Sequence, residues 1–297
     1  GGKKSEGESG EKSLKGEVKI DGSSTVYPVT EAVAEEFRRE HPDVKVTVGV
    51  SGAGGGFKKF GRGEIDINDA SRPIKELEEQ ACKENNIQFA GIKVAFDGLA
   101  VVVSKENTWL QDITVEELKK IWEPEAQEKI KKWSQVRAGW PDVDFNLYGA
   151  GVASGTYDYF TEAIVGKSGS SRGDYTASED DNVLVQGVSG DKNALGFFGI
   201  AYYEENKEKL RLVPVNNGKG PITPTSATIM SGEYAPLSRP IFIYVTKVAT
   251  QRPEVVEFVD FYIDNAAFLV KDVGYIPLTE KEYEEEAVKF DAFLKGK

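Results

Sequence analysis

Three short segments of the chain combine glycine with serine or threonine, and each directly precedes an apolar pattern of helical period. The segments are Asp21-Gly22-Ser23-Ser24-Thr25, Ser51-Gly52-Ala53-Gly54-Gly55-Gly56 and Ser154-Gly155-Thr156. Such a segment offers backbone N–H groups and small hydroxyls at the start of a helix, where an anion can be held without a formal counter-charge. One such turn is weak evidence, because these residues are ordinary helix caps. Three in one chain predict an oxyanion that is held from several sides.

Two arginines and one aspartate could add charge to such a site. Arg72 and Arg172 each follow a serine, and a guanidinium can bind a tetrahedral oxyanion through two parallel hydrogen bonds. The alternative for both arginines is a surface salt bridge. Asp69 could accept a proton from an oxyanion such as hydrogen phosphate and so exclude fully ionised sulfate. Its alternative is a turn in which the carboxylate bonds its own backbone.

The motifs of common enzymes and metal sites are incomplete. Gly166-Lys167-Ser168 resembles the end of a nucleotide-binding loop, but Thr161 occupies the position of its first glycine. The only histidine, His41, lies at a polar helix end and is the only imidazole that could serve a serine nucleophile. The carboxylates of residues 179–181 could hold a hard cation, but a favourable helix dipole explains them more simply. The sequence therefore predicts a binding protein without catalytic residues, cofactor or metal.

Composition limits the partners of the chain. Its 297 residues predict two domains of ordinary size, and its net charge of −12 argues against nucleic acid or an anionic membrane surface. The single cysteine, Cys82, excludes an internal disulfide, and no apolar run approaches the length of a membrane span. Because the only methionine is Met230, we expect that Gly1 is not a translation start; a removed export signal is compatible with this.

Alternation of strand and helix patterns predicts an α/β fold with mixed sheets flanked by helices. Short strands are expected at residues 18–20, 44–50, 65–67, 145–148 and 196–203. The first four of these lead into the glycine-rich segments or into Asp69-Ala70-Ser71-Arg72-Pro73. In an open α/β sheet, ligands bind beyond the carboxyl ends of the strands, so we expect the polar residues there to converge.

Two long apolar segments, residues 92–104 and 240–246, are expected to be buried strands on either side of a middle block. We therefore expect the chain to leave the first domain and later return to it. The first domain would comprise residues 17–104 and 233–297, and the second would comprise residues 105–232. Residues 1–16 hold one apolar side chain and predict a flexible tether.

In combination, the motifs resemble those of PstS-like phosphate-binding proteins, the type II periplasmic solute-binding receptors of phosphate ABC importers. The resemblance covers nearly all of residues 17–297 and rests on segments 21–28, 51–57, 69–74, 154–160 and 171–178. It implies a discontinuous first domain and a hinge that closes two domains over a dehydrated phosphate. It also implies a monomer that captures phosphate in the periplasm or outside the cell and delivers it to a membrane permease. A lipid anchor before processing is compatible with this role.

Carried over residue by residue, the resemblance implies phosphate contacts from both domains. The first domain would contribute Ser24, Thr25, Ser51, Gly54, Ser71 and Arg72, and the second would contribute Ser154, Gly155 and Thr156. The chain departs from the pattern at Ala150-Gly151-Val152-Ala153, where relatives usually carry an acidic residue and many carry an arginine. This change would weaken affinity, alter selectivity among oxyanions or reflect engineering of the chain, and Arg172 could supply the guanidinium. The alternatives are a binder of another oxyanion or phosphorylated metabolite, and a secreted phosphatase.

Overall fold

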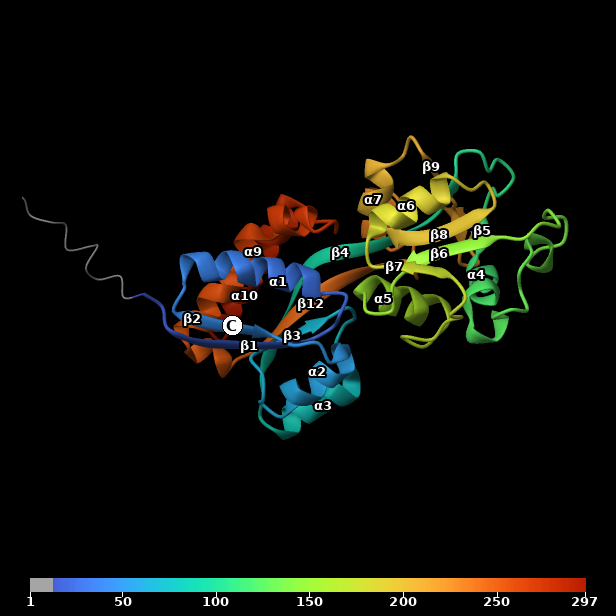
Figure 1. Ribbon diagram of the computed structural model, residues 1–297. Helices are drawn as coiled ribbons and strands as arrows, with labels where there is room; N and C mark the ends of the chain where they lie inside the picture. Colours follow the sequence, from blue (N-terminus) through green and yellow to red (C-terminus); the bar gives the residue numbers. More distant parts are fainter. Residues whose placement is uncertain (1–12) are drawn as a thin grey trace, which may run out of the picture. The chain divides into compact units, whose positions relative to one another are not determined.

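The computed structural model describes residues 13–297, so residues 1–12 of the expected tether lie outside the described part. The chain divides into two compact units, each an α/β structure (Figure 1). Unit 1 takes in the chain up to Val94 together with Phe242–Leu269 and Leu278–Lys297, and unit 2 comprises Ala95–Ile241 and Val270–Pro277. Among the described residues, none of the helices has the length and apolar character of a membrane span.

The chain passes between the units inside two long strands, β4 (Phe89–Ser104) and β12 (Ser238–Thr246). The sequence places these crossings after residues 104 and 232, whereas the units change over after Val94 and after Ile241. β4 is largely apolar on both sides of its crossing point, so hydrophobicity does not mark where the first unit ends there.

Unit 1 contains the strand order β2-β1-β3-β12. The strands β1 (Gly16–Gly22), β2 (Val44–Val48) and β3 (Ile67–Ala70) are parallel, and β12 runs antiparallel beside β3. Its helices are α1 (Tyr27–Glu40), α2 (Gly52–Gly61), α3 (Glu76–Glu84), α9 (Pro253–Asp272), whose last turn passes into unit 2, and α10 (Glu280–Leu294). Figure 1 shows α1 and α9 on one face of the sheet and α2 and α3 on the other.

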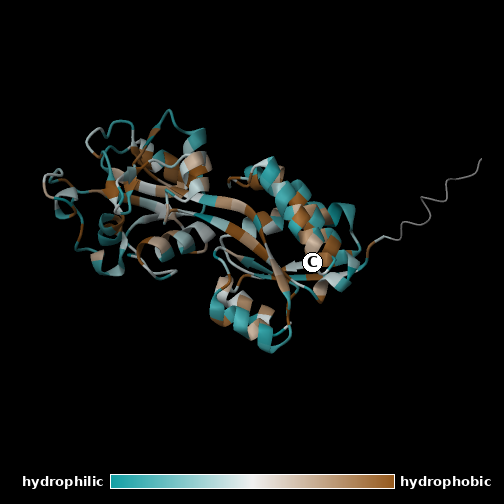
Figure 2. Ribbon diagram, turned by 180° about the vertical axis from the view of Figure 1, so that it is seen from behind, coloured by the Kyte–Doolittle hydropathy of each residue, from teal (hydrophilic) through white to brown (hydrophobic). Residues whose placement is uncertain are grey.

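Aromatic contacts hold these helices to the sheet of unit 1. Phe37 of α1 meets Phe258 of α9 edge to face, with ring centroids 5.1 Å apart. On the other face, Phe57 of α2 meets Tyr244 of β12 at 5.1 Å. In each unit, the outward faces of the helices are largely hydrophilic (Figure 2). Because the apolar face of each helix packs on the sheet, it fixes the direction in which the first turn of that helix points.

Unit 2 contains the strand order β4-β8-β6-β7, with β9 also paired to β4. These strands are β8 (Ala194–Gly199), β6 (Asn146–Ala150), β7 (Thr176–Ser178) and β9 (Leu210–Leu212). A smaller sheet joins β11 (Pro221–Ile222), β10 (Val215–Asn216) and β5 (Ile113–Thr114). The helices are α4 (Val115–Trp122), α5 (Gly155–Ile164), α6 (Asp181–Ser189), α7 (Ile200–Glu205) and α8 (Ser226–Ser231). Phe160 of α5 stacks on Phe197 of β8 with centroids 3.8 Å apart.

The observed strand boundaries differ from the predicted ones by a few residues, and two of these differences change where residues lie. The strand expected at residues 65–67 is β3, Ile67–Ala70, which has partners in β1 and β12, so Asp69 lies inside the sheet and not in a turn after it. The strand expected at residues 196–203 ends at Gly199, where α7 begins with the buried Ile200. A short apolar run looks the same in the sequence whether it forms one strand or a shorter strand followed directly by the buried start of a helix.

The Asn68 side chain of β3 limits how closely α2 and β1 can approach. Asn68 and Asp69 point to opposite faces, as neighbours in a strand must. A Cβ atom added at Gly56 would lie 1.8 Å from Asn68 Oδ1, and one added at Gly22 would lie 2.6 Å from the same oxygen. Gly22 also has a φ of +127°, which disfavours other residues. These glycines therefore serve the packing of β1 and α2 on β3.

Replacement of Gly56 by alanine is expected to reduce the free energy of unfolding by about 1–3 kcal/mol, because the new methyl group forces Asn68 or α2 to shift. Urea unfolding measures this. Gly61→Ala is the matched control in the same helix, since the nearest atom to its Cβ would be 3.5 Å away, an ordinary contact. Equal stability of the two variants would contradict the packing role of Gly56.

Candidate functional site

The carboxyl ends of three strands meet at one edge of unit 1. Because β2, β1 and β3 are parallel neighbours, the segments that follow them begin side by side. The Ser51 N–H donates to the Gly22 carbonyl at 3.1 Å, and the Ser23 N–H donates to the Asp69 carbonyl at 3.0 Å. The structure thus brings together at this edge six residues predicted for the first domain: Ser24, Thr25, Ser51, Gly54, Ser71 and Arg72. The Asp69 side chain is not among them.

Within this edge, the carboxylate of Asp21 bonds three groups. Its Oδ1 accepts from the Gly22 N–H at 2.7 Å and from the Ser51 hydroxyl at 2.5 Å, while Oδ2 accepts from Lys59 Nζ at 2.8 Å. Burial opposes ionisation of Asp21, but the hydrogen bonds from Lys59, Ser51 and Gly22 lower its pKa below the usual value. Asp21 is therefore a carboxylate at neutral pH. No motif in the sequence marks Lys59, which lies two helical turns after Ser51.

The hydrogen bond to Asp21 leaves the start of α2 uncapped. Ser51 occupies the N-cap position of this helix, but its side chain makes no capping hydrogen bond. The first N–H groups of an α-helix have no partner within the helix. Residues 52–54 at this position carry no side chain larger than a methyl group. The first turn of α2 can therefore donate backbone hydrogen bonds to an anion.

Arg72 follows β3 and is held by Glu78 of α3. Nη1 and Nη2 donate to the two carboxylate oxygens of Glu78 at 2.7 and 2.9 Å, and Nη1 also donates to the Pro73 carbonyl. Nη2 lies 3.6 Å from the position of a Cβ at Gly54, next to the first turn of α2. The Nε–H and the second Nη2–H bond nothing in the described part of the chain. This edge of the guanidinium can still bind an oxyanion through two parallel hydrogen bonds.

Three hydroxyl residues complete the edge of unit 1. Thr25 and Ser71 are buried, and Ser24 is half-buried. The Thr25 N–H donates to the Ser23 hydroxyl oxygen at 3.1 Å, which fixes the turn before α1. Ser24 is therefore the most accessible of these three predicted ligand residues.

The side chain of Asp69 does not reach this edge, which corrects its predicted contact with the ligand. It is fully buried, and its Oδ1 accepts from the Thr30 hydroxyl at 2.9 Å, which in turn lies 2.9 Å from the Tyr262 hydroxyl. Its Oδ2 has no partner among the described residues. Burial raises the pKa of Asp69 well above the usual range. The pleat of β3 turns this side chain toward α1 and α9, inside unit 1.

In unit 2, the predicted residues Ser154, Gly155 and Thr156 form the start of α5. Ser154 is the N-cap, and its hydroxyl oxygen accepts from the Tyr157 N–H at 3.1 Å, which leaves the hydroxyl hydrogen to be donated outward. Before this turn, the Ala153 N–H donates to Glu179 Oε1 at 3.2 Å. Val152 beside it is 69% exposed. Glu179, which lies outside the motif, thus holds the loop of residues 150–153, where the chain departs from the family pattern.

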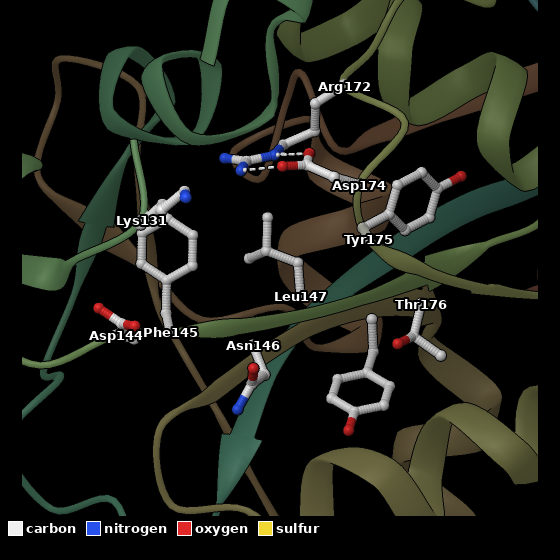
Figure 3. Close-up of a pocket in the computed structure, with 10 residues that line it drawn as sticks. Lys131, Asp144, Phe145, Asn146, Leu147, Arg172, Asp174, Tyr175 and Thr176 are labelled. Carbon is white, nitrogen blue, oxygen red and sulfur yellow. Dashed lines mark hydrogen bonds and ion pairs between the residues drawn. The ribbon is translucent and has the colours of Figure 1, made fainter. Parts of the chain in front are cut away.

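Arg172 is used inside unit 2, which corrects its predicted role as an oxyanion ligand. Its guanidinium is 3% exposed and pairs with both oxygens of Asp174, at 2.7 and 3.0 Å. Nη1 donates to the carbonyl oxygens of Ile121 and Ile130. Figure 3 shows this pair above Leu147 in a pocket of about 430 Å³, whose lining includes no residue of the Ser154–Thr156 turn. Arg172 therefore forms a salt bridge, as in the alternative interpretation, but its own side chain is buried and not on the surface.

Comparison with known proteins gives the family. The model of the PBP superfamily domain matches residues 7–266. Protein SphX of Synechococcus elongatus is 50% identical over 274 residues, which cover 92% of this chain and 81% of that protein. The phosphate-binding protein PstS of Staphylococcus haemolyticus is 39% identical over 279 residues, which cover 93% of this chain and 85% of that protein.

Solved structures agree with these relatives. A possible phosphate binding protein from Planctomyces limnophilus has a TM-score of 0.91 and 50% identity, covering 95% of this chain and all of that one. An ABC-type phosphate transport receptor from Vibrio cholerae has a TM-score of 0.65 and 25% identity, covering 88% of this chain and all of that one. The predicted two-domain α/β fold is confirmed. The chain belongs to the PBP superfamily, together with the relatives named SphX and PstS.

Proposed function

We propose that the protein binds inorganic phosphate outside the cytoplasmic membrane and delivers it to the permease of an ABC importer. The similarity to SphX and PstS, each over more than nine tenths of this chain, carries the proposal. The polar edge of unit 1 supports it, because strand ends, an uncapped helix and an arginine suit a tetrahedral oxyanion. The proposal includes two further points: the receptor is a monomer, and a lipid anchor holds it near the membrane.

Each unit offers hydrogen-bond donors that suit a phosphate oxygen. From unit 1 these are the first N–H groups of α2 and the free edge of Arg72, with Ser24, Thr25 and Ser71 around them. From unit 2 the donors are at the start of α5, with the Ser154 hydroxyl foremost. Phosphate held by these donors would stabilise the ligand-bound form of the chain. This is reversible capture, in which no bond of the phosphate is broken.

Calorimetric titration of ligand-stripped protein at neutral pH tests this function directly. We expect one phosphate per chain, no heat from sulfate, and no release of product from a chromogenic phosphomonoester. Absence of phosphate binding would contradict the proposal. Heat from another oxyanion or a phosphorylated metabolite would support the alternative suggested by the exposed Val152 and its neighbour Ala153.

Replacement of Arg72 by alanine is expected to weaken phosphate binding by at least about 1.5 kcal/mol, the range for a charge-assisted hydrogen bond that is left unmade. The dissociation constant from calorimetry measures the effect. Arg39→Ala on α1 is the control, because the side chain of this arginine is 67% exposed and, among the described residues, pairs with Glu35 and Glu36 of its own helix. An unchanged dissociation constant in Arg72→Ala would remove Arg72 from the ligand set.

Replacement of Asp69 by asparagine is expected to change the pH dependence of stability but not phosphate affinity. Burial raises the pKa of Asp69 in the folded state, so its contribution to stability is full below the usual value of 3.8 and is lost as pH rises toward the folded pKa. Asparagine does not ionise, so the variant does not lose stability at this position as the pH rises. Its melting temperature relative to the natural chain should therefore increase from about pH 4 through neutrality. A weakened affinity for phosphate would instead return Asp69 to the ligand set.

A further inference from the structure

We propose that Asp21 is a positioning residue that makes Ser51 a hydrogen-bond acceptor. Unit 1 would thereby select an oxyanion that carries a hydrogen, such as hydrogen phosphate, over sulfate. The inference rests on the proposed function, because it needs an oxyanion at the strand-end edge of unit 1. It assigns to Ser51 the selection that the sequence predicted for Asp69, whose side chain is buried elsewhere.

The direction of the hydrogen bond between Ser51 and Asp21 carries the argument. An ionised carboxylate only accepts, so the hydrogen between Ser51 Oγ and Asp21 Oδ1, 2.5 Å apart, belongs to the serine. The Asp21 side chain is 11% exposed, and its other partners, the Gly22 N–H and Lys59 Nζ, are also donors. With its hydrogen committed to Asp21, the Ser51 hydroxyl presents only lone pairs to a ligand.

The position of Ser51 places these lone pairs beside the anion-binding helix start. Ser51 is exposed, and its Oγ would lie 3.1 Å from a Cβ added at Gly55, within the first turn of α2. Because the side chain does not cap the helix, an oxyanion that accepts from the first N–H groups of α2 would also meet Ser51 Oγ.

The chemistry of the ligand then decides between phosphate and sulfate. At neutral pH every phosphate ion carries at least one P–OH group, which can donate to Ser51 Oγ. Sulfate carries no hydrogen, so one of its oxygens would face the serine lone pairs with both atoms acting as acceptors. Discrimination arises from this unfavourable contact as well as from the bond that phosphate gains.

Glycine and lysine neighbours keep the carboxylate in place. A Cβ added at Gly49 would lie 2.7 Å from Asp21 Oδ2, so only glycine there leaves room for the bond to Lys59. If Ser51 turned to cap α2, it would leave Asp21 with one donor fewer in a buried position, which is costly. The arrangement therefore holds Ser51 as an acceptor before the ligand arrives.

The test compares the dissociation constants of sulfate, arsenate and phosphate, measured by calorimetry. Asp21→Ala combined with Lys59→Met removes the ion pair without a change in net charge and frees the Ser51 hydrogen to be donated. We expect the ratio of the sulfate to the phosphate dissociation constant to fall about tenfold or more, the effect of one hydrogen bond of this kind. Arsenate also carries a hydrogen near neutral pH, so its ratio to phosphate should stay constant.

Two single variants give the comparison its controls. Lys59→Met alone keeps the bond between Asp21 and Ser51, so both anions should lose affinity alike and the sulfate ratio should stay at that of the natural chain. Ser51→Ala removes the acceptor from an exposed position that caps nothing, so it should fold and lower the sulfate ratio as the double variant does. If the double variant does not fold, Ser51→Ala decides alone.

An unchanged sulfate ratio in Ser51→Ala would overturn the inference and leave Asp21 with a structural role only. That result is distinct from failure of the proposed function, in which the natural chain itself would bind no phosphate and the inference would fall with it. A melting temperature measured without ligand separates a loss of folding from a change of selectivity.

Discussion

The carboxylate of Asp21 is the interaction on which the polar edge of unit 1 depends. It joins the end of β1, the loop after β2 and the middle of α2 through Gly22, Ser51 and Lys59. Without it, parallel pairing would still bring the strand ends together, but Ser51 would be free to cap α2 as serines usually do. The buried carboxylate of Asp21 therefore sets both the orientation of the Ser51 side chain and the number of N–H groups left without a cap at the start of α2.

The pleat of β3 sets a second constraint, because its neighbouring polar residues must point to opposite faces. Asn68 lies under Gly22 and Gly56 and fixes how closely β1 and α2 approach, whereas Asp69 turns to Thr30 and Tyr262. The glycines of the motif therefore differ in how strictly they are required. Gly56 allows close packing, whereas a Cβ atom at Gly54 would make an ordinary contact with Arg72.

Much of this arrangement could be predicted from the sequence, because strand and helix periods place the glycine-rich segments at strand ends and those ends do meet. The placement of Asp69 could not be predicted, because it depends on where β3 ends. A strand that ended at Ile67 would leave Asp69 in a turn, whereas β3 continues to Ala70 and includes Asp69 in the sheet. Lys59 and Glu78 were missed for a related reason. Each acts on the site through a side chain on a neighbouring helix, and no local pattern marks that contact.

Similar motifs acquire different chemistry from their surroundings. Arg72 and Arg172 both follow a serine and both pair with a carboxylate, but Glu78 leaves one edge of Arg72 unused, whereas Asp174 and two carbonyls take up Arg172. The N-cap serines differ in the same way. Ser154 accepts from its helix and keeps a hydrogen to donate, while Ser51 gives its hydrogen to Asp21 and keeps lone pairs. The same residue type at the same helix position therefore offers a donor in unit 2 and an acceptor in unit 1.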